Sequence, residues 1–142
     1  MAITHRYTIM CDEVRIEINR KFMLIGVYTP NISVPQLPFV LPSLTFFQML
    51  ESDRPQQLGV RFRLQHLETG RIIAQGMGRI GFQRPGTGIN ALRLPNVPLI
   101  AVGTYNFVME IDGEREPLIF SFDVILNIPQ QPAILGGLPN IG

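Results

Sequence analysis

Three side chains are candidates for nucleophilic or thiol chemistry in this 142-residue sequence: His5, Cys11 and His66. In an extended strand His5 and Cys11 share a face but lie about 20 Å apart, because a strand rises about 3.3 Å per residue. No sequence motif indicates that His66 lies near either of them. A hydrolase needs an activating base beside its nucleophile. We therefore predict no catalytic site, rank a hydrolase as the least favoured function, and interpret Cys11 as a buried structural thiol.

Metal and cofactor binding also lack a complete set of ligands. Two histidines and one cysteine do not make a zinc site by themselves. Acidic residues cluster at the tip of the last expected hairpin, where oxygen ligands would suit calcium: Glu110, Asp112, Glu114 and Glu116. They lack the length and spacing of a dedicated calcium loop. A solvated turn is the simpler interpretation, and we predict no metal and no cofactor.

The run of residues 76–81 (GMGRIG) matches the glycine pattern of a dinucleotide-binding loop. That loop works because a helix starts directly after the glycines and its N-terminus holds the pyrophosphate. Residues 82–86 (FQRPG) cannot start a helix, and Ala101 stands about 20 residues on, where an acidic residue is needed. We interpret the glycines as positions that permit strand twist or close sheet packing.

An arginine-bearing strand face is the first of two candidate binding surfaces. Its outward-facing residues are Arg61, Arg63, Gln65, Gln75 and Arg79. Stacked arginines on a flat sheet can bind phosphate or acidic protein. No aromatic side chains interleave with them to stack on bases, so nucleic-acid binding is weakly supported. A plain solvated strand face remains the alternative.

The second candidate surface is the segment after the last expected strand, residues 127–142. It is rich in Pro and Gly, carries no charge, and contains the apolar residues Ile128, Ile134, Leu135, Leu138 and Ile141. A free segment of this composition exposes apolar side chains that associate with other surfaces. We expect it to dock on its own domain or on a neighbouring molecule by strand addition.

The elements that position these residues follow a period of two, which is typical of β-strands. Val14, Ile16 and Ile18 predict a half-buried strand that ends in an Asn19-Arg20 turn, with the Asn left-handed. Residues 22–28 (FMLIGVY) are apolar on both faces, which predicts a central, covered strand. The expected segments that follow are a proline-rich crossing between two sheets over 29–43 and a strand over 44–50.

One hairpin is specific enough to predict its register. Inward-facing Val60, Phe62 and Leu64 must share a side with Ile72, Ala74 and Gly76, which requires even residues to oppose even residues. A three-residue loop, Glu68-Thr69-Gly70, satisfies this requirement. The predicted pairs are Phe62 with Gly76, Arg63 with Gln75, and Arg61 with Met77.

The remaining elements complete an all-β domain. We expect a loop over 83–90, two short strands over 91–94 and 99–102 split by prolines, and a hairpin that turns at Asp112-Gly113 between strands over 105–111 and 118–124. The count is seven to nine short strands with turn signals between them and no convincing helix. This pattern predicts a single-domain antiparallel β-sandwich, immunoglobulin-like or C2-like, over residues 1–126.

Composition limits where and with what the chain works. The net charge of +1 gives no general attraction to nucleic acid. The single cysteine rules out an internal disulfide, and residues 1–13 lack the apolar core of a signal peptide. Prolines interrupt both long uncharged stretches, so neither is a credible spanning helix. We expect a cytoplasmic protein that does not bind membranes.

Four short motifs resemble those of a family of small bacterial proteins known only as a domain of unknown function. They are C-D-x-V-R at residues 11–15, L-I-G-V-Y at 24–28, P-x-L-P at 35–38 and G-x-Y-x-F at 103–107. The resemblance covers about residues 8–126. It implies a β-sandwich and supplies no activity or catalytic residues.

These observations favour a non-enzymatic interaction or structural protein, acting in a homo-oligomer or a larger bacterial assembly. The expected partner is another protein or a second copy of the chain. The alternative is a module that binds anions or nucleic acid through the arginine-bearing strand face.

Overall fold

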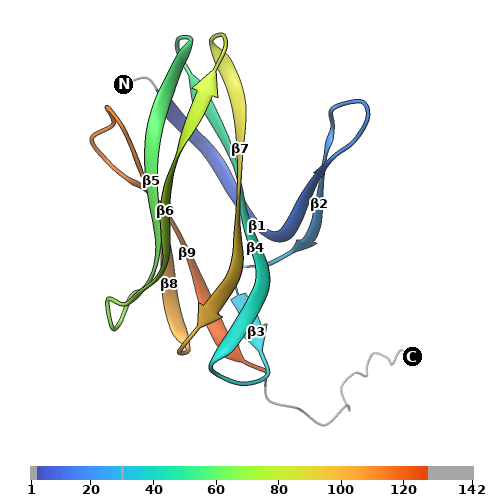
Figure 1. Ribbon diagram of the computed structural model, residues 1–142, viewed down its shortest axis with the longest axis vertical. Coiled ribbons are helices and arrows are strands. Elements are labelled where there is room, and N and C mark those ends of the chain that lie inside the picture. Colours follow the sequence, from blue (N-terminus) through green and yellow to red (C-terminus); the bar gives the residue numbers. More distant parts are fainter. Residues whose placement is uncertain (1–2, 30, 128–142) are drawn as a thin grey trace.

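Nine β-strands and no helix make up the part of the chain that the computed structural model describes, residues 3–29 and 31–127 (Figure 1). The strands are β1 (Ile3–Ile16), β2 (Phe22–Val27), β3 (Asn31–Val34), β4 (Phe39–Ser52), β5 (Gln56–His66), β6 (Ile72–Phe82), β7 (Gly86–Leu99), β8 (Gly103–Ile111) and β9 (Leu118–Leu126). They form two packed sheets, which we call sheet A (order β2-β1-β4-β7) and sheet B (order β3-β9-β8-β5-β6). The predicted single-domain β-sandwich is confirmed; its neighbouring strands are antiparallel, except that β3 runs parallel to β9.

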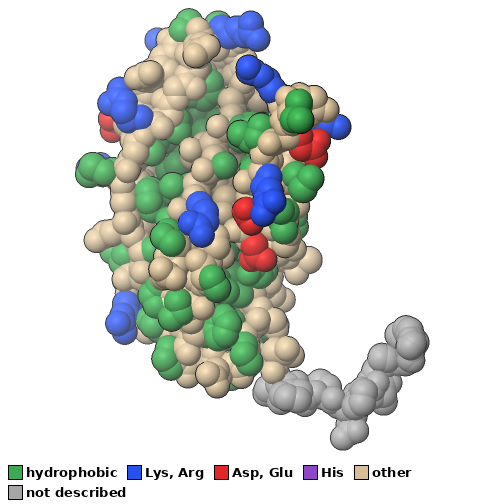
Figure 2. Space-filling view, turned by 45° about the vertical axis from the view of Figure 1, so that its right-hand side comes forward, with side chains coloured by type: hydrophobic (Ala, Val, Ile, Leu, Met, Phe, Trp, Pro, Cys, Tyr) green, Lys and Arg blue, Asp and Glu red, His purple; other side chains and the backbone are tan. Residues whose placement is uncertain are grey.

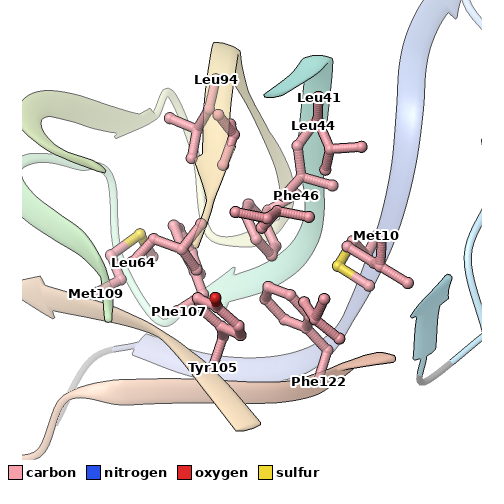
Figure 3. Close-up of a cluster of buried hydrophobic side chains, with 14 of the residues drawn as sticks. Met10, Leu41, Leu44, Phe46, Leu64, Leu94, Tyr105, Phe107, Met109 and Phe122 are labelled. Carbon is pink, nitrogen blue, oxygen red and sulfur yellow. The ribbon is translucent and has the colours of Figure 1, made fainter. Parts of the chain in front are cut away.

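Aromatic side chains from both sheets fill the space between them. Phe46 of sheet A stacks on Phe107 of sheet B with ring centroids 4.0 Å apart. Tyr105 stacks in the same way on Phe122 at 5.6 Å. Figure 3 shows these four rings meeting in the middle of the sandwich. Each fully buried ring of this size stabilises the fold by about 1.5–3 kcal/mol relative to an exposed one, so this cluster fixes how the two sheets face each other.

The β5–β6 hairpin has the predicted register. Phe62 pairs with Gly76, Arg63 with Gln75 and Arg61 with Met77. The Phe62 ring covers the bare backbone of Gly76, and a Cβ there would lie 2.6 Å from the ring.

The connection of this hairpin differs from the prediction. Four residues, 67–70, separate the hydrogen-bonded residues His66 and Arg71, and Gly70 has φ 74°. One extra residue in β6, Ile73, then restores the even register. As a result Ile73 packs on the core, and Ile72, predicted to face inward, is exposed.

The β1–β2 hairpin contradicts three predictions. β2 is the edge strand of sheet A rather than a central strand. Ile16 and Ile18 are 69% and 105% exposed instead of half-buried. The left-handed turn residue is Arg20, with φ 67°, rather than Asn19. Figure 1 shows the reason: the end of β1 and all of β2 bend away from the rest of the sheet, so side chains that would be inward in a flat sheet reach solvent.

The proline-rich segment crosses between the sheets, as predicted, and does so twice. It contributes β3 to sheet B and then returns to sheet A as β4. The Leu37-Pro38 bond within it is cis, the less common isomer, which is typically found in tight turns.

The two short strands expected on either side of Pro95 and Pro98 are one continuous strand, β7. Prolines are tolerated there because β7 is an edge strand, where one side of the backbone needs no ladder partner. Asn96, with φ 52°, marks a kink. Leu94 faces the core before the kink and Val97 faces it after. The expected loop over 83–90 is likewise shorter, since β7 begins at Gly86.

The last hairpin, β8–β9, is as predicted. Gly113 adopts φ 83° in the turn, and the amide of Glu114 donates to the carbonyl of Ile111. Phe122 and Val124 are buried on β9. The described residues contain no helix with the length and hydrophobicity needed to cross a bilayer.

Candidate functional site

The arginine-bearing strand face lies on the outer side of sheet B. Arg61 and Arg63 project from β5 toward one acidic residue, Glu110 of β8. The distances are 3.1 Å from Arg61 Nη2 to Glu110 Oε1 and 3.5 Å from Arg63 Nη1 to Glu110 Oε2. One carboxylate therefore offsets part of the positive charge that makes these arginines attractive to anions.

Around this ion pair is an open groove of about 450 Å³ that includes Gln75 and Met77 of β6. The other two predicted residues are not part of the groove lining. Gln65 accepts a hydrogen bond from Arg63 Nε at 3.2 Å and donates to the carbonyl of Gly70 at 2.9 Å. Arg79 donates to Gln57 Oε1 at 3.5 Å. The groove therefore gathers Arg61, Arg63 and Gln75 of the predicted set.

Glu110, expected from the sequence at an acidic hairpin tip, lies on β8 directly opposite Arg61. Alternation indicates that Glu110 faces outward, but its pairing with Arg61 depends on β8 being the neighbour of β5. Within the described residues, no three His, Cys, Asp or Glu side chains come close enough to hold a metal ion.

Cys11 and His5 do not share a face, contrary to the prediction. His5 pairs with Leu50 and Tyr7 with Met49, so β1 carries one extra residue, Arg6, between them. This bulge turns His5 toward the core side while Cys11 lies on the outer side of sheet A. Cys11 is fully buried, as predicted, and burial raises the pKa of its thiol.

Asp12 anchors the base of the β1–β2 hairpin. Its carboxylate accepts a hydrogen bond from the Tyr28 hydroxyl at 2.8 Å, and its carbonyl accepts bonds from Ser43 at 2.7 Å and Thr45 at 3.2 Å. Burial, followed by the bond to Asp12, raises the pKa of Tyr28. Gly26 adopts φ 68°, and the Asp12 carboxylate fills the place of its missing Cβ. This set of contacts fixes the bend of the hairpin.

His66 is buried with both ring nitrogens occupied. Nδ1 lies 2.9 Å from the Thr69 hydroxyl, and Nε2 lies 2.9 Å from the carbonyl of Val102 and 3.3 Å from Glu68. The neighbouring Tyr105 hydroxyl donates to the Ala101 carbonyl at 2.7 Å. These bonds hold the β7–β8 connection, which is a structural rather than a chemical arrangement.

The outer side of sheet A carries a surface that sequence reasoning missed. Strand alternation places six apolar residues there, and Phe22 joins them; Arg93 lies on the same side next to Ala91. We call the seven apolar residues the apolar face: Tyr7, Ile9, Phe22, Phe47, Met49, Ile89 and Ala91. Phe22 reaches this side because the bent hairpin brings its ring 5.3 Å from that of Phe47. Tyr7 and Phe22 are each 40% exposed. In the view of Figure 2, hydrophobic side chains are spread over the surface, and basic side chains lie next to acidic ones.

Next to the apolar face, a groove of about 370 Å³ opens between β1 and β9. It shares Ile9 with that face and adds Val27, Tyr28 and Phe120, and no charged side chain lines it. The apolar face therefore continues around the side of the sandwich.

Two further predictions concern the glycine run and the C-terminal segment. The glycine run lies within β6 and is followed by a turn and β7, so no helix N-terminus is available for a pyrophosphate. The five apolar residues named in the C-terminal segment, Ile128, Ile134, Leu135, Leu138 and Ile141, lie outside the described residues.

Solved structures share the architecture. The C-terminal domain of wzt is similar over 89% of this chain and 75% of that domain, with a TM-score of 0.55 and 10% sequence identity. The β-glucosidase EmGH1 from Erythrobacter marinus is similar over 87% of this chain but only 15% of its own, with a TM-score of 0.52 and 8% identity. At these identities the likeness concerns the fold alone.

No curated protein matches the sequence. A family is nevertheless identified by its sequence model, which matches residues 6–124. The chain belongs to this family of unknown function, DUF6941.

Proposed function

We propose that the chain is a non-enzymatic protein-binding module whose binding surface is the apolar face of sheet A. The observation that carries the proposal is the exposure of Tyr7 and Phe22 on the outer side of a sheet. An antiparallel sheet with one side in the core normally turns polar residues to solvent. A contiguous apolar patch there marks an interaction surface.

The charges near the apolar face favour a protein partner over an anionic one. Arg6 lies 2.9 Å from Glu51, and Arg15 lies 3.0 Å from Glu13. These two basic residues are already paired, which weakens their attraction to nucleic acid or anionic lipid; among the described residues Arg93, next to Ala91 on this side, makes no ion pair. The expected partner therefore presents an apolar surface of its own.

The absence of an enzymatic role is part of the proposal. Cys11 is buried with a raised pKa, which makes its thiol a poor nucleophile. Both ring nitrogens of His66 already have partners. Both side chains, the strongest candidates for catalysis in the sequence, are therefore better suited to stabilising the fold than to catalysis.

Site-specific photo-crosslinking in cells that naturally produce the protein tests the proposal. A benzophenone amino acid replaces Tyr7 on the apolar face. In a separate variant it replaces Ile119, which is 56% exposed on the outer side of sheet B. We expect a discrete protein adduct at position 7, identified by mass spectrometry, and none at position 119.

Equal crosslinking at both positions, or none at position 7, would refute the proposal. Met49→Lys supplies a further check, because it places a charge in the middle of the apolar face beside Tyr7. It should abolish the adduct while circular dichroism and thermal unfolding show an intact sandwich.

A further inference from the structure

We propose that β6 of one molecule pairs with β6 of a second copy about a two-fold axis through Met77, so that the two copies of sheet B form one continuous sheet. This surface is distinct from the apolar face. An unpaired strand edge displays backbone donors and acceptors and recruits another strand unless something blocks it.

Of the four edge strands in the described residues, β6 is the least protected. β3 has four residues and β2 has six, and the bend of the hairpin distorts β2. β7 is long, but Pro95 and Pro98 interrupt its hydrogen-bonding edge. β6 has 11 residues, contains no proline, and carries one charged residue, Arg79. It is therefore the edge best suited to add a strand.

The sequence of β6 is complementary to itself in one register. Met77 is the middle residue of Ile72–Phe82, so an antiparallel pair centred on it aligns residues 74–80, the regular stretch beyond the extra residue Ile73, with the same stretch of its copy. In that register Gln75 lies opposite Arg79 of the second copy, and the reverse pair forms on the other side of the axis. A glutamine carbonyl is a good acceptor for a guanidinium. Arg79 already donates to such a carbonyl, that of Gln57, within its own sheet.

The same register explains two other features of the strand. Met77 is 78% exposed, and pairing would place the two Met77 side chains against each other. Gly76 would lie opposite Gly78 of the second copy, so no side chain obstructs the approach of the two backbones. A register centred on Arg79 instead places two arginines face to face, and like charges directly opposite each other are unfavourable.

Disulfide trapping tests the pairing. Directly opposed residues in an antiparallel pair have Cα atoms about 4.5–5.5 Å apart, within the range that a disulfide spans. Met77→Cys should therefore form a covalent dimer under mild oxidation. The native Cys11 is buried and does not interfere. Ile119→Cys, at an exposed position on β9, three strands away from β6 in the sheet, is the matched control and should stay monomeric.

A mixing experiment fixes the register. Chains with Gln75→Cys and chains with Arg79→Cys should each crosslink poorly alone and should form a disulfide dimer when mixed. Crosslinking of either variant alone at the level of the mixture would contradict the two-fold axis at Met77.

The chain without added cysteines gives the decisive equilibrium measurement. By sedimentation velocity we expect concentration-dependent dimers. Gln75→Glu, which faces Arg79 of the second copy, should lower the dimer Kd by about threefold or more, and Gln75→Arg should raise it by a similar factor. A chain that stays monomeric at about 100 µM, with Met77→Cys no more reactive than Ile119→Cys, would overturn the proposal. Photo-crosslinking from position 7 should be unchanged in Gln75→Arg, which distinguishes the β6 pairing from partner binding at the apolar face.

Discussion

The outer sides of the two sheets differ although both belong to one sandwich. Sheet B turns mainly arginine, glutamine and glutamate to solvent, with Met77 and Ile119 as exposed apolar residues among them, and its exposed charges pair across neighbouring strands. Sheet A turns Tyr7, Met49 and Ile89 outward from three adjacent strands. A polar side is stable in contact with water, whereas an apolar side is stabilised when its own chain or another molecule packs on it.

Sheet A covers part of its apolar side with its own chain. The β1–β2 hairpin bends until Phe22 meets Phe47, which is only 5% exposed. The bend depends on Gly26 and on the Asp12 contacts at its base. The rest of the apolar face is left for another molecule, so the bend decides how much of sheet A is available for binding.

The largest expected effect tests whether the covered part of sheet A stabilises the fold. Phe47→Ala should lower the free energy of unfolding by about 3–5 kcal/mol, since it removes a buried ring and leaves a cavity. Val108→Ala, at a buried position on the outer side of sheet B, should cost about 1.6 kcal/mol for two lost carbons. Urea denaturation measures both. Equal losses would mean that the two outer sides contribute alike.

The next effect concerns the bend itself. Gly26→Ala should cost about 2–3 kcal/mol, because alanine resists positive φ and its Cβ must displace the Asp12 carboxylate. Gly113 also has positive φ, but nothing lies within 4 Å of the place of its Cβ. Gly113→Ala should therefore cost only about 1–2 kcal/mol. A Gly26→Ala variant no less stable than Gly113→Ala would show that the bend does not depend on Asp12.

A smaller effect tests the hydrogen bond at the base of the hairpin. Tyr28→Phe should cost about 1.5 kcal/mol, since it removes the hydroxyl that donates to Asp12. The raised pKa of Tyr28 means that the folded state favours the neutral phenol. Its contribution is therefore complete below about pH 10, the ordinary tyrosine pKa, and is lost as the pH rises beyond it.

Urea midpoints of the parent chain and Tyr28→Phe, measured between pH 7 and pH 11, check this prediction. The two midpoints should converge at the alkaline end. A gap that stays constant across this range would show that the phenol proton does not contribute.

The smallest effect concerns sheet B. Glu110→Gln should change stability by no more than about 0.5 kcal/mol, because exposed ion pairs contribute little. If Arg61 and Arg63 bind anions, this variant should elute from heparin at higher salt than the parent chain, and reversing both charges should abolish retention. No retention of either the parent chain or Glu110→Gln would leave this side as a solvated strand face.

The alternation of apolar and polar residues along the chain was enough to predict the β5–β6 register and which side of β9 faces the core. The register required Phe62 to meet Gly76, and this pair forms. The loop was wrong, because a four-residue loop with one extra residue in β6 gives the same parity as a three-residue loop. Parity alone cannot distinguish the two.

The errors cluster where the chain departs from a flat, regular strand. The apolar residues of β2 resemble a central strand, but β2 is an edge strand, and Phe22 packs on Phe47 through a bend that depends on distant residues. The extra residue at Arg6 reverses the side on which His5 lies. Glu110 was missed as a partner of Arg61 because its role depends on which strand neighbours β5. The apolar face escaped prediction for the same reason.

The bonds around the β7–β8 connection have a consequence for motion. Tyr105 bonds to Ala101 and His66 to Val102, so two of the three residues that connect β7 to β8 are hydrogen-bonded to buried side chains. Backbone amides in such a region open only when the whole domain unfolds, whereas an edge hairpin with solvated bonds opens locally. In deuterated water, the amides of β8 should therefore be among the last to exchange, and those of β2 among the first.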